Sequence, residues 1–465
     1  MKIKFCGAAQ NVTGSKHLLQ IGEKKVLLDC GLFQGNPRES AGLNRHWPFD
    51  IKEVSHVVLS HGHLDHCGGI LRLAKEGWKG KVWCTEATKD VVYWILKDAA
   101  YIQQGDYEYA VRKAKMKAED IPEPLFGPDD VDTAMELFET IPYQSWTDIE
   151  PNIRVKMYDA GHILGSSVIA LEYVEDGVIR RLGFSGDLGR KKVPILRDPQ
   201  VIEEDVDIWI MESTYGDRLH ASIDDLETRL VEVIKKAVER KAKIICPAFS
   251  LGRTQELIYV LHKLTDEGKL PRFPMYVDSP LAGSITTVFG KHLDLFDNHS
   301  RVDFLNHGDN PFGFRNLTYT RDKTASEALN GMPGPMLIIS ASGMANAGRV
   351  LHHLKHNVSD PNNMVLITGF MAKHTLGRSL VEKEPTVRIF GESYPVRAEI
   401  QIFNEFSAHA DYQGLIDYTL SLKGIKKIFL VHGEAGQTNI LKARLENLKQ
   451  GWEVIVPAYE EEFIV

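Results

Sequence analysis

The sequence predicts an α/β protein with two domains. The chain has 465 residues, which exceeds the size at which one hydrophobic core usually keeps growing. Its first part alternates short β-branched segments with turn residues, whereas from about Ser213 strands and helices follow one another in turn. This second rhythm is typical of βαβ units around a mostly parallel sheet.

The first part begins with short strands, because each of four segments is rich in branched apolar residues and bounded by turn residues. They are KIKF, HLLQI, KVLLD and HVVLS. From Glu86 to Glu139, apolar residues three and four positions apart predict helices. The helical segments are DVVYWILKDAAYI, YEYAVRKAKMK and DDVDTAMELFETI. Strands are expected again at VKMYDA, VIALEYV and VIRRLGFSGD.

The second part contains the alternating units, from the helix LETRLVEVIKKAVERK onward. It continues with strand KIICPAF, a helix from Gly252, strand MYVDSP, a helix through Ile285, and strands MLIIS and MVLIT. The chain is then expected to return to the first domain with IQIF, a helix after Tyr412, IFLVHG and a closing helix. We therefore predict a first domain at 1–212, an inserted domain at 213–388 and a return segment at 389–465.

Charge and cysteine usage restrict the class of protein. A net charge of −8 does not by itself indicate a nucleic-acid partner, although local arginines such as Arg253, Arg349 and Arg378 could line one groove. The five cysteines are odd in number and form no CxxC pair, so a reducing cytoplasm is expected. The N-terminal segment lacks the features of a signal peptide, and no apolar run approaches a membrane span.

The segment SHGHLDHCGG after the strand HVVL predicts a metal site. It places His61, His63, Asp65 and His66 within six residues. Imidazole and carboxylate groups are the ligands of catalytic zinc, and this number of groups suits two ions better than one. A lone histidine is more often a surface or capping residue, but this density favours ligands.

The pattern HxHxDH followed by Gly-Gly resembles the signature of the metallo-β-lactamase superfamily. Asp29 in LLDCG is similar to the first family motif, a buried support for the ligand loop. His162 in DAGHILGS and Asp187 in FSGDLG are similar to the third and fourth motifs. The resemblance implies one ion held by His61, His63, His162 and Asp187, and a second held by Asp65, His66, Asp187 and His432.

The later part of the chain resembles the β-CASP nucleases of this superfamily, which include the endonuclease subunit of the cleavage and polyadenylation specificity factor. Glu212 in MESTYGD, His409 in FSAHAD and His432 in FLVHGE are similar to the family motifs A, B and C. Further similar segments are PAFSLGRTQEL, VDSPLA, SASGM and HTLGR. The resemblance covers nearly the whole chain. It implies an αββα metallo-β-lactamase sandwich with an inserted α/β β-CASP domain, a mostly parallel sheet flanked by helices.

The implied activity is hydrolysis of RNA phosphodiester bonds by a hydroxide that bridges two Zn²⁺ ions, with Mn²⁺ as an alternative metal. Asp65 would orient that hydroxide, His409 would act as general acid, and Glu212 would hold His409. The products would carry 5′-phosphate and 3′-hydroxyl ends. The resemblance implies an endonuclease and leaves an added 5′–3′ exonuclease activity open.

RNA is the expected partner, because His432 in motif C is typical of the RNA-acting relatives. Single-stranded RNA is favoured over double-stranded RNA. Phosphate contacts are expected from the residues Ser340, Ser342, Gly343, Arg253, Thr375 and Arg378. His374 departs from the glycine frequent in relatives, and its role stays open. A homodimer is also left open, and no membrane partner is expected.

Three alternatives remain at this point. A small-molecule hydrolase such as a lactonase or thioesterase would not need so long an inserted domain. A non-catalytic RNA-binding subunit would have lost ligands, and here the expected ligands are all present. DNA cleavage would be distinguished by comparing matched RNA and DNA oligonucleotides.

Overall fold

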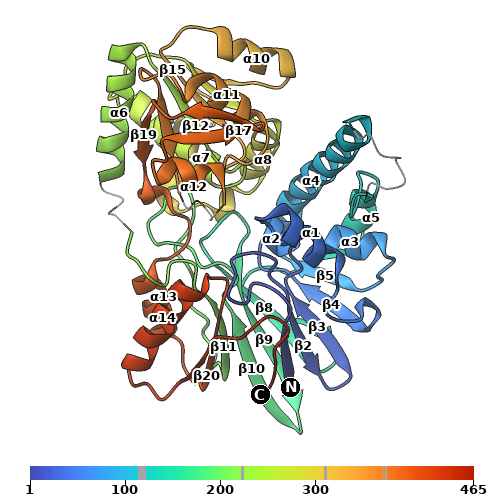
Figure 1. Cartoon of the computed structure of the whole chain (residues 1–465). Helices are drawn as coiled ribbons and strands as arrows, with labels where there is room; N and C mark the ends of the chain where they lie inside the picture. Colours follow the sequence, from blue (N-terminus) through green and yellow to red (C-terminus); the bar gives the residue numbers. More distant parts are fainter. Residues whose placement is uncertain (114–121, 221, 223–224, 308–311, 370, 372–373) are drawn as a thin grey trace. The chain divides into compact units, whose positions relative to one another are not determined.

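The chain folds into two compact units. The computed structural model describes residues 1–113, 122–220, 222, 225–307, 312–369, 371 and 374–465. Unit 1 consists of Met1–Lys191, Asp198–Leu219 and His409–Val465, and unit 2 consists of Lys192–Arg197 and His220–Ala408. Figure 1 follows the chain from its N-terminus (blue) to its C-terminus (red). Unit 1 is therefore built from segments far apart in the sequence.

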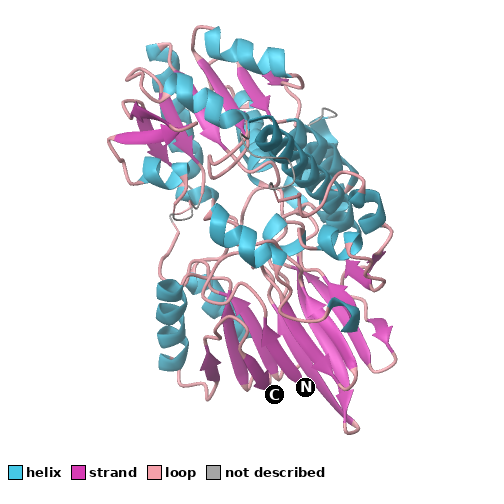
Figure 2. Cartoon of the chain, turned by 45° about the vertical axis from the view of Figure 1, so that its right-hand side comes forward, coloured by secondary structure: helices cyan, strands magenta, loops and turns pink. Residues whose placement is uncertain are grey.

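Among the described residues, unit 1 forms two seven-stranded sheets (Figure 2). The first has the strand order β22, β1, β2, β3, β4, β5, β6. Its strands are β1 (Lys2–Phe5), β2 (His17–Ile21), β3 (Lys24–Leu28), β4 (Val54–Val58), β5 (Lys81–Cys84), β6 (Phe138–Thr140) and β22 (Glu462–Ile464). The second has the order β21, β20, β11, β10, β9, β8, β7. Its strands are β7 (Thr147–Glu150), β8 (Ile153–Asp159), β9 (Ser167–Glu175), β10 (Val178–Phe184), β11 (Ile208–Glu212), β20 (Lys427–Val431) and β21 (Glu453–Ile455).

The two sheets share a core, and helices cover their outer faces. Successive residues of β4 separate these layers, because side chains alternate between the faces of a strand. Val58 joins the core between the sheets, whereas Val57 packs with α3 and α4. In β11, Ile210 faces the shared core and Trp209 packs with α13 and α14. This αββα arrangement confirms the predicted fold class.

The described helices of unit 1 come from its N-terminal segment and from its C-terminal segment. They are α1 (Pro37–Arg45), α2 (Leu64–Cys67), α3 (Ile70–Lys75), α4 (Glu86–Lys113), α5 (Asp130–Met135), α13 (Tyr412–Ser421) and α14 (Ala435–Asn447). The end of the predicted helix YEYAVRKAKMK, residues 114–117, lies outside the described residues. The helical prediction for DDVDTAMELFETI was wrong at its end, since α5 stops at Met135 and β6 pairs with β5.

Unit 2 contains a six-stranded sheet among its described residues, and every strand pair in it is parallel. Its order is β14 (Leu317–Tyr319), β13 (Met275–Asp278), β15 (Met336–Ser340), β12 (Lys243–Pro247), β16 (Met364–Ile367) and β19 (Glu399–Ile402). A separate hairpin pairs β17 (Thr386–Ile389) with β18 (Glu392–Pro395). The helices are α6 (Leu226–Arg240), α7 (Arg253–Asp266), α8 (Pro280–Lys291), α9 (Asn298–His307), α10 (Lys323–Gly331), α11 (Arg349–Asn357) and α12 (Leu376–Val381).

One strand belongs to a different unit from the one expected. The sequence prediction assigned IQIF to the return segment of the first domain. Strand β19 instead pairs in parallel with β16, with Ile400 opposite Val365, and extends the sheet of unit 2. After β19, the chain returns to unit 1 at His409. Over the described residues, no helix combines the length and apolar character needed to cross a membrane.

Candidate metal centre

The residues predicted as ligands lie at or after the carboxyl ends of strands in unit 1, and two of them, Asp65 and His66, lie in the short helix α2 that follows β4. His61 and His63 follow β4, His162 follows β8, and Asp187 follows β10. His432 follows β20 directly, with a backbone φ of 49°. Loops at one end of a packed scaffold commonly carry functional residues. The sandwich therefore supplies a rigid base for side chains that are distant in sequence.

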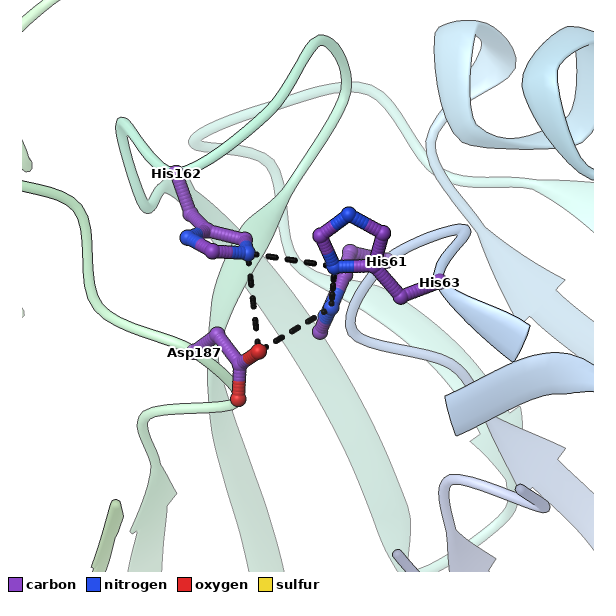
Figure 3. Close-up of side chains that lie close together, drawn as sticks. All are labelled: His61, His63, His162 and Asp187. Carbon is purple, nitrogen blue, oxygen red and sulfur yellow. Dashed lines mark hydrogen bonds and ion pairs between the residues drawn. The ribbon is translucent and has the colours of Figure 1, made fainter. Parts of the chain in front are cut away.

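Three histidines and Asp187 form the first ligand group (Figure 3). His61 Nε2 lies 3.1 Å from His63 Nδ1, which lies 3.2 Å from His162 Nε2. Asp187 Oδ2 lies 3.4 Å from His61 Nε2 and 3.5 Å from His162 Nε2. The four ligand atoms thus point toward one common space, as the close-up shows.

Asp65, His66 and His432 form the second group. His66 Nε2 lies 3.1 Å from His432 Nε2, and Asp65 Oδ2 lies 3.6 Å from that same His432 atom. Asp187 connects the two groups, because its Oδ1 lies 3.4 Å from His66 Nε2 while its Oδ2 faces His61 and His162. Each oxygen of one carboxylate therefore serves a different group.

Asp29 and the serines beside it hold the ligand loop in place. His66 Nδ1 lies 2.7 Å from Asp29 Oδ2 and donates its hydrogen there, which directs Nε2 toward Asp187 and His432. Asp29 Oδ1 accepts from the Ser60 backbone N–H at 2.8 Å. Asp29 Oδ2 also accepts from the hydroxyls of Ser60 and Ser15. A fully buried carboxylate with these donors fixes one orientation of the His66 ring.

The loops that carry these ligand groups approach one another so closely that two positions have no room for a side chain. A Cβ on Gly31, two residues after Asp29, would lie 1.5 Å from the backbone oxygen of Asp65. A Cβ on Gly189, two residues after Asp187, would lie 2.0 Å from the oxygen of Gly161 beside His162. Glycine at both positions lets the ligand loops pack backbone against backbone.

The donor set fits divalent cations. In a tetrahedral zinc site with Zn–N bonds near 2.05 Å, ligand atoms lie roughly 3.3 Å apart. The four atoms of the first group are separated by 3.1 to 3.5 Å along the contacts given above. The buried Asp187 Oδ1 has no hydrogen-bond donor among the described residues, as expected of an atom reserved for a cation. The cluster is therefore a candidate site for divalent metal.

Protonation agrees with this interpretation. Burial, and next the neighbouring His61, lower the pKa of His63 to about 3, so this ring is neutral and able to bind metal. Burial opposes ionisation of Asp187, but His432 and His66 outweigh it and hold the pKa of that carboxyl well below its usual range. Burial lowers the pKa of His66, whereas Asp187 and Asp29 raise it to about 10. A cation that binds His66 would therefore displace a proton.

His409 and Glu212 lie beside the first group. Both Glu212 oxygens lie 3.0 Å from His409 Nδ1, and Oε1 also accepts the Leu188 backbone N–H at 2.6 Å. His409 Nδ1 therefore donates to Glu212, and Nε2 points to the metal groups, 3.9 Å from Asp187 Oδ2. Burial lowers the pKa of His409, but the Glu212 and Asp187 carboxylates outweigh it and raise the pKa to about 9. This ring is placed to hold a proton at Nε2.

Sequence reasoning missed the hydroxyl groups that orient these ligands. Ser60 Oγ lies 3.0 Å from His61 Nδ1, and Thr214 Oγ1 lies 3.0 Å from His432 Nδ1. Ser60 directly precedes His61, so its place in the motif was a usable signal. Thr214 and His432 are 218 positions apart, and no local pattern connects them.

The six residues predicted to contact RNA all lie in unit 2. Ser340 ends β15, is buried, and donates to the Asp278 backbone oxygen at 3.0 Å. Ser342 Oγ accepts the Asn346 N–H at 3.2 Å. A Cβ on Gly343 would lie 2.5 Å from the Phe249 ring. These contacts organise the SASGM loop itself.

The other three predicted RNA contacts lie at the N-terminal ends of α7 and α12. Arg253 starts α7, is 6% exposed, and pairs with Glu256 in the same turn, so its guanidinium is largely withdrawn from solvent. Thr375 caps α12 by accepting the Arg378 N–H at 3.1 Å. Arg378 is half-buried and pairs with Glu382 at 2.6 Å. The α12 segment meets the SASGM loop where Gly377 donates to the Met344 oxygen at 3.1 Å.

Three families of known domains match the chain. The Metallo-beta-lactamase superfamily matches residues 14–248, the Beta-Casp domain matches residues 254–380, and the Zn-dependent metallo-hydrolase RNA specificity domain matches residues 393–457. Together they extend over both units.

Characterised relatives are similar over nearly the whole chain. The chain is 38% identical to Ribonuclease TTHA0252 of Thermus thermophilus over 93% of both proteins. It is 32% identical to the RNase J-like protein of Methanocaldococcus jannaschii, covering 94% of this chain and 93% of that protein. It is 29% identical to Cleavage and polyadenylation specificity factor 73 of Drosophila melanogaster, covering 96% of this chain and 62% of the longer relative. These matches confirm the resemblance drawn from the motifs, and the chain belongs to the β-CASP branch of the metallo-β-lactamase superfamily.

Proposed function

We propose that this protein is a metal-dependent ribonuclease that hydrolyses RNA phosphodiester bonds. The observation that carries the proposal is the sharing of Asp187 between two ligand groups, with His409 held by Glu212 beside them. The names of the relatives, two of which are ribonucleases or ribonuclease-like, support RNA as the substrate. The match to an RNA specificity domain supports it as well.

Two divalent ions would be held by the groups described above, with Asp187 common to both. Zinc is the proposed metal because three of the four ligands in the first group are imidazoles, with Mn²⁺ as the alternative. When bound, such ions neutralise phosphate oxygens and supply a hydroxide nucleophile near neutral pH. The proposal distinguishes the protein from a non-catalytic relative, because the full ligand set converges.

The chain's own residues supply positioning and proton transfer. Asp65 is half-buried beside His432, where its free carboxylate oxygen can orient the attacking hydroxide. His409 donates the proton that the leaving oxygen needs, from Nε2. Glu212 fixes the ring by accepting from Nδ1. Attack by hydroxide leaves 5′-phosphate and 3′-hydroxyl ends, whereas a cyclic phosphate would mean that the RNA attacked itself.

Substrate contacts in unit 2 remain part of the proposal. Ser342, Thr375 and Arg378 are the best placed of the predicted RNA contacts, since the SASGM loop and the start of α12 are joined by hydrogen bonds. Cleavage within single-stranded RNA is the primary activity proposed, and digestion from a 5′ end is an additional one. The five free cysteines support a reducing compartment such as the cytoplasm.

The test combines metal analysis with digestion of RNA labelled at one end or the other. Wild-type protein should contain two metal equivalents and cleave single-stranded RNA to 5′-phosphate products, with the matched DNA cleaved far more slowly. His409→Ala should retain both metal equivalents and lose about 10²- to 10⁴-fold in rate, because it lacks the general acid. Full activity of that variant would remove His409 from the mechanism. Intact RNA after incubation with metal-loaded wild-type protein would reject the function.

A further inference from the structure

A cavity in unit 2 lies between the hairpin β17–β18 and the start of α12. Its volume is about 730 Å³, within the range of small-molecule sites. Its lining includes the polar side chains of Asn346, His374, Ser379 and Glu384, and the hairpin contributes Arg388 and Phe390. The hairpin packs on α11 and α12 (Figure 1). The cavity is thus part of the ordered fold of this unit.

The turn at the tip of the hairpin contains a residue that its backbone conformation disfavours. Phe390 and Gly391 form a two-residue loop between the paired residues Ile389 and Glu392. Both loop residues have positive φ, 51° and 83°, which is the type I′ turn that Asn-Gly strongly prefers. A bulky residue seldom adopts such a conformation. Phenylalanine here is unfavourable for the hairpin alone, which points to a role for the ring.

The ring and the neighbouring cation are both presented to solvent. Phe390 is 52% exposed, and its ring contacts that of His352, with ring centroids 4.7 Å apart and the planes inclined by 43°. Arg388 is exposed on β17 and makes no ion pair with any residue that the structure describes. Arg388 stands two residues before the exposed Phe390 in a chain of net charge −8. Together they offer a stacking surface and a phosphate ligand.

We propose that this cavity of unit 2 binds one nucleotide of single-stranded RNA, with the base on Phe390 and the phosphate on Arg388. The amide of Asn346, the hydroxyl of Ser379 and the carboxylate of Glu384 provide donors and acceptors for a base edge. The chemistry favours RNA over a protein segment, because an apolar peptide would not use the free guanidinium. This inference rests on the proposed ribonuclease function and adds a second contact to the substrate.

Phe390→Asn is the central test variant. It replaces the ring with the residue that the turn prefers, so the hairpin and the thermal midpoint of the protein should be retained or improved. The KM for a 20-nucleotide single-stranded RNA should rise about tenfold, because one stacked base is lost, while kcat stays the same. Phe390→Trp keeps an aromatic ring and should keep the wild-type KM.

Two further measurements complete the design. Hydrolysis of bis(p-nitrophenyl) phosphate, which contains no nucleotide for the cavity to bind, should be unchanged in Phe390→Asn. Arg388→Gln should reduce by about one the slope of log affinity against log salt for the RNA, because one phosphate contact is removed. The inference is overturned if Phe390→Asn keeps the wild-type KM for the 20-nucleotide RNA, or if the variant alters self-association instead.

Failure of the proposed function would be recognised separately. If the wild-type protein hydrolyses bis(p-nitrophenyl) phosphate but leaves RNA intact, the ribonuclease proposal fails. The cavity is then tested by fluorescence anisotropy with the same labelled RNA. Weaker binding by Phe390→Asn supports the nucleotide site even then, and equal binding rejects it.

Discussion

Two buried lysines of unit 1 experience opposite surroundings. Lys16 donates to the Gly31 carbonyl at 2.5 Å and lies 4.5 Å from the centre of the Phe33 ring, with no carboxylate paired to it among the described residues. Burial lowers the pKa of Lys16 to about 8. Lys156 pairs with Glu204 at 3.0 Å; burial lowers its pKa, but Tyr158 and Glu204 outweigh this and raise it.

The replacement Lys16→Met should therefore have a pH-dependent effect on stability. Because the folded pKa of Lys16 lies below the unfolded value, the native state binds fewer protons between about pH 8 and 10.4, and wild-type stability rises with pH there. Relative to wild type, the free energy of unfolding of Lys16→Met should fall by about 3 kcal/mol between about pH 7.5 and 10.5. Urea denaturation at both pH values measures this difference.

Lys156→Met is the matched control. The raised pKa of Lys156 keeps it charged in the folded protein through this window, and the unfolded side chain loses its proton only at the upper end, so its replacement should cost about 2 kcal/mol at pH 7.5, and this cost should change by no more than about 0.5 kcal/mol at pH 10.5. A pH-independent effect of the replacement Lys16→Met would mean that the ammonium group of Lys16 is solvated in the folded wild-type protein.

At the scale of single residues, a functional residue could be predicted where several potential ligands stand close together in the sequence. His61, His63, Asp65 and His66 stand in one short motif, so their chemistry was readable directly. His162 required the family resemblance, because a histidine in a glycine turn is commonplace. The burial of Arg253 depends on Glu256 and on packing that no charge count reveals.

Among the elements, β13 is joined to two helices of unit 2 through one carboxylate. Asp278 at the end of β13 accepts from Ser326 of α10 at 2.5 Å, and from Arg349 and His353 of α11 at 2.7 Å each. Its carboxylate is fully buried. Burial alone would raise the pKa of Asp278, but these donors lower it below its usual value.

Asp278→Asn should destabilise the protein by about 3 kcal/mol near pH 7, because Arg349 and His353 lose an anionic partner. The folded pKa is depressed, so the contribution of Asp278 is present above the unfolded pKa of about 3.9 and is lost as pH falls through the folded value. Urea denaturation followed by circular dichroism should show variant and wild type converging in acid.

The control for this experiment is Asp266→Asn on α7, whose carboxylate is largely exposed and pairs with His262 in the same helix. It should change stability by less than about 0.5 kcal/mol. An equal effect of both replacements would contradict a special role for Asp278.

Element types were predictable where a periodic segment was long, as in α6, whose buried residues recur at helical spacing. Short strands were harder. The segment beginning at Phe138 continues a helical period, yet it forms β6 and pairs with the edge of β5. For β19, the alternation predicted a strand but could not specify which sheet it joins, since that depends on pairing with β16 across the fold.

At the scale of the whole molecule, the two units contain different spectroscopic reporters, tryptophans in one and a cysteine in the other. All seven tryptophans lie in segments of unit 1, at positions 47, 78, 83, 94, 146, 209 and 452. Cys246 is the single cysteine in the sequence of unit 2 and is buried. Tryptophan fluorescence therefore follows unit 1, and labelling of the Cys246 thiol follows unit 2.

Metal removal should destabilise unit 1 selectively, because the ligand groups found among the described residues all belong to it. An ion present at a thousandfold excess over its Kd stabilises the fold that binds it by about 4 kcal/mol. After chelation, the fluorescence midpoint in urea should shift down, whereas the midpoint for Cys246 labelling should stay constant. Equal shifts of both midpoints would show that the units unfold as one cooperative block.

The two oxygens of Asp187 have a consequence for how the centre fills. If two ions bind as proposed, one carboxylate would neutralise both, so the first ion would use charge that the second also needs and would fix the side chain in the orientation that the second requires. Loading should follow a steep isotherm if the fixed orientation dominates and two separated steps if the shared charge dominates. Calorimetric titration of the metal-free protein with a divalent cation would distinguish these two outcomes.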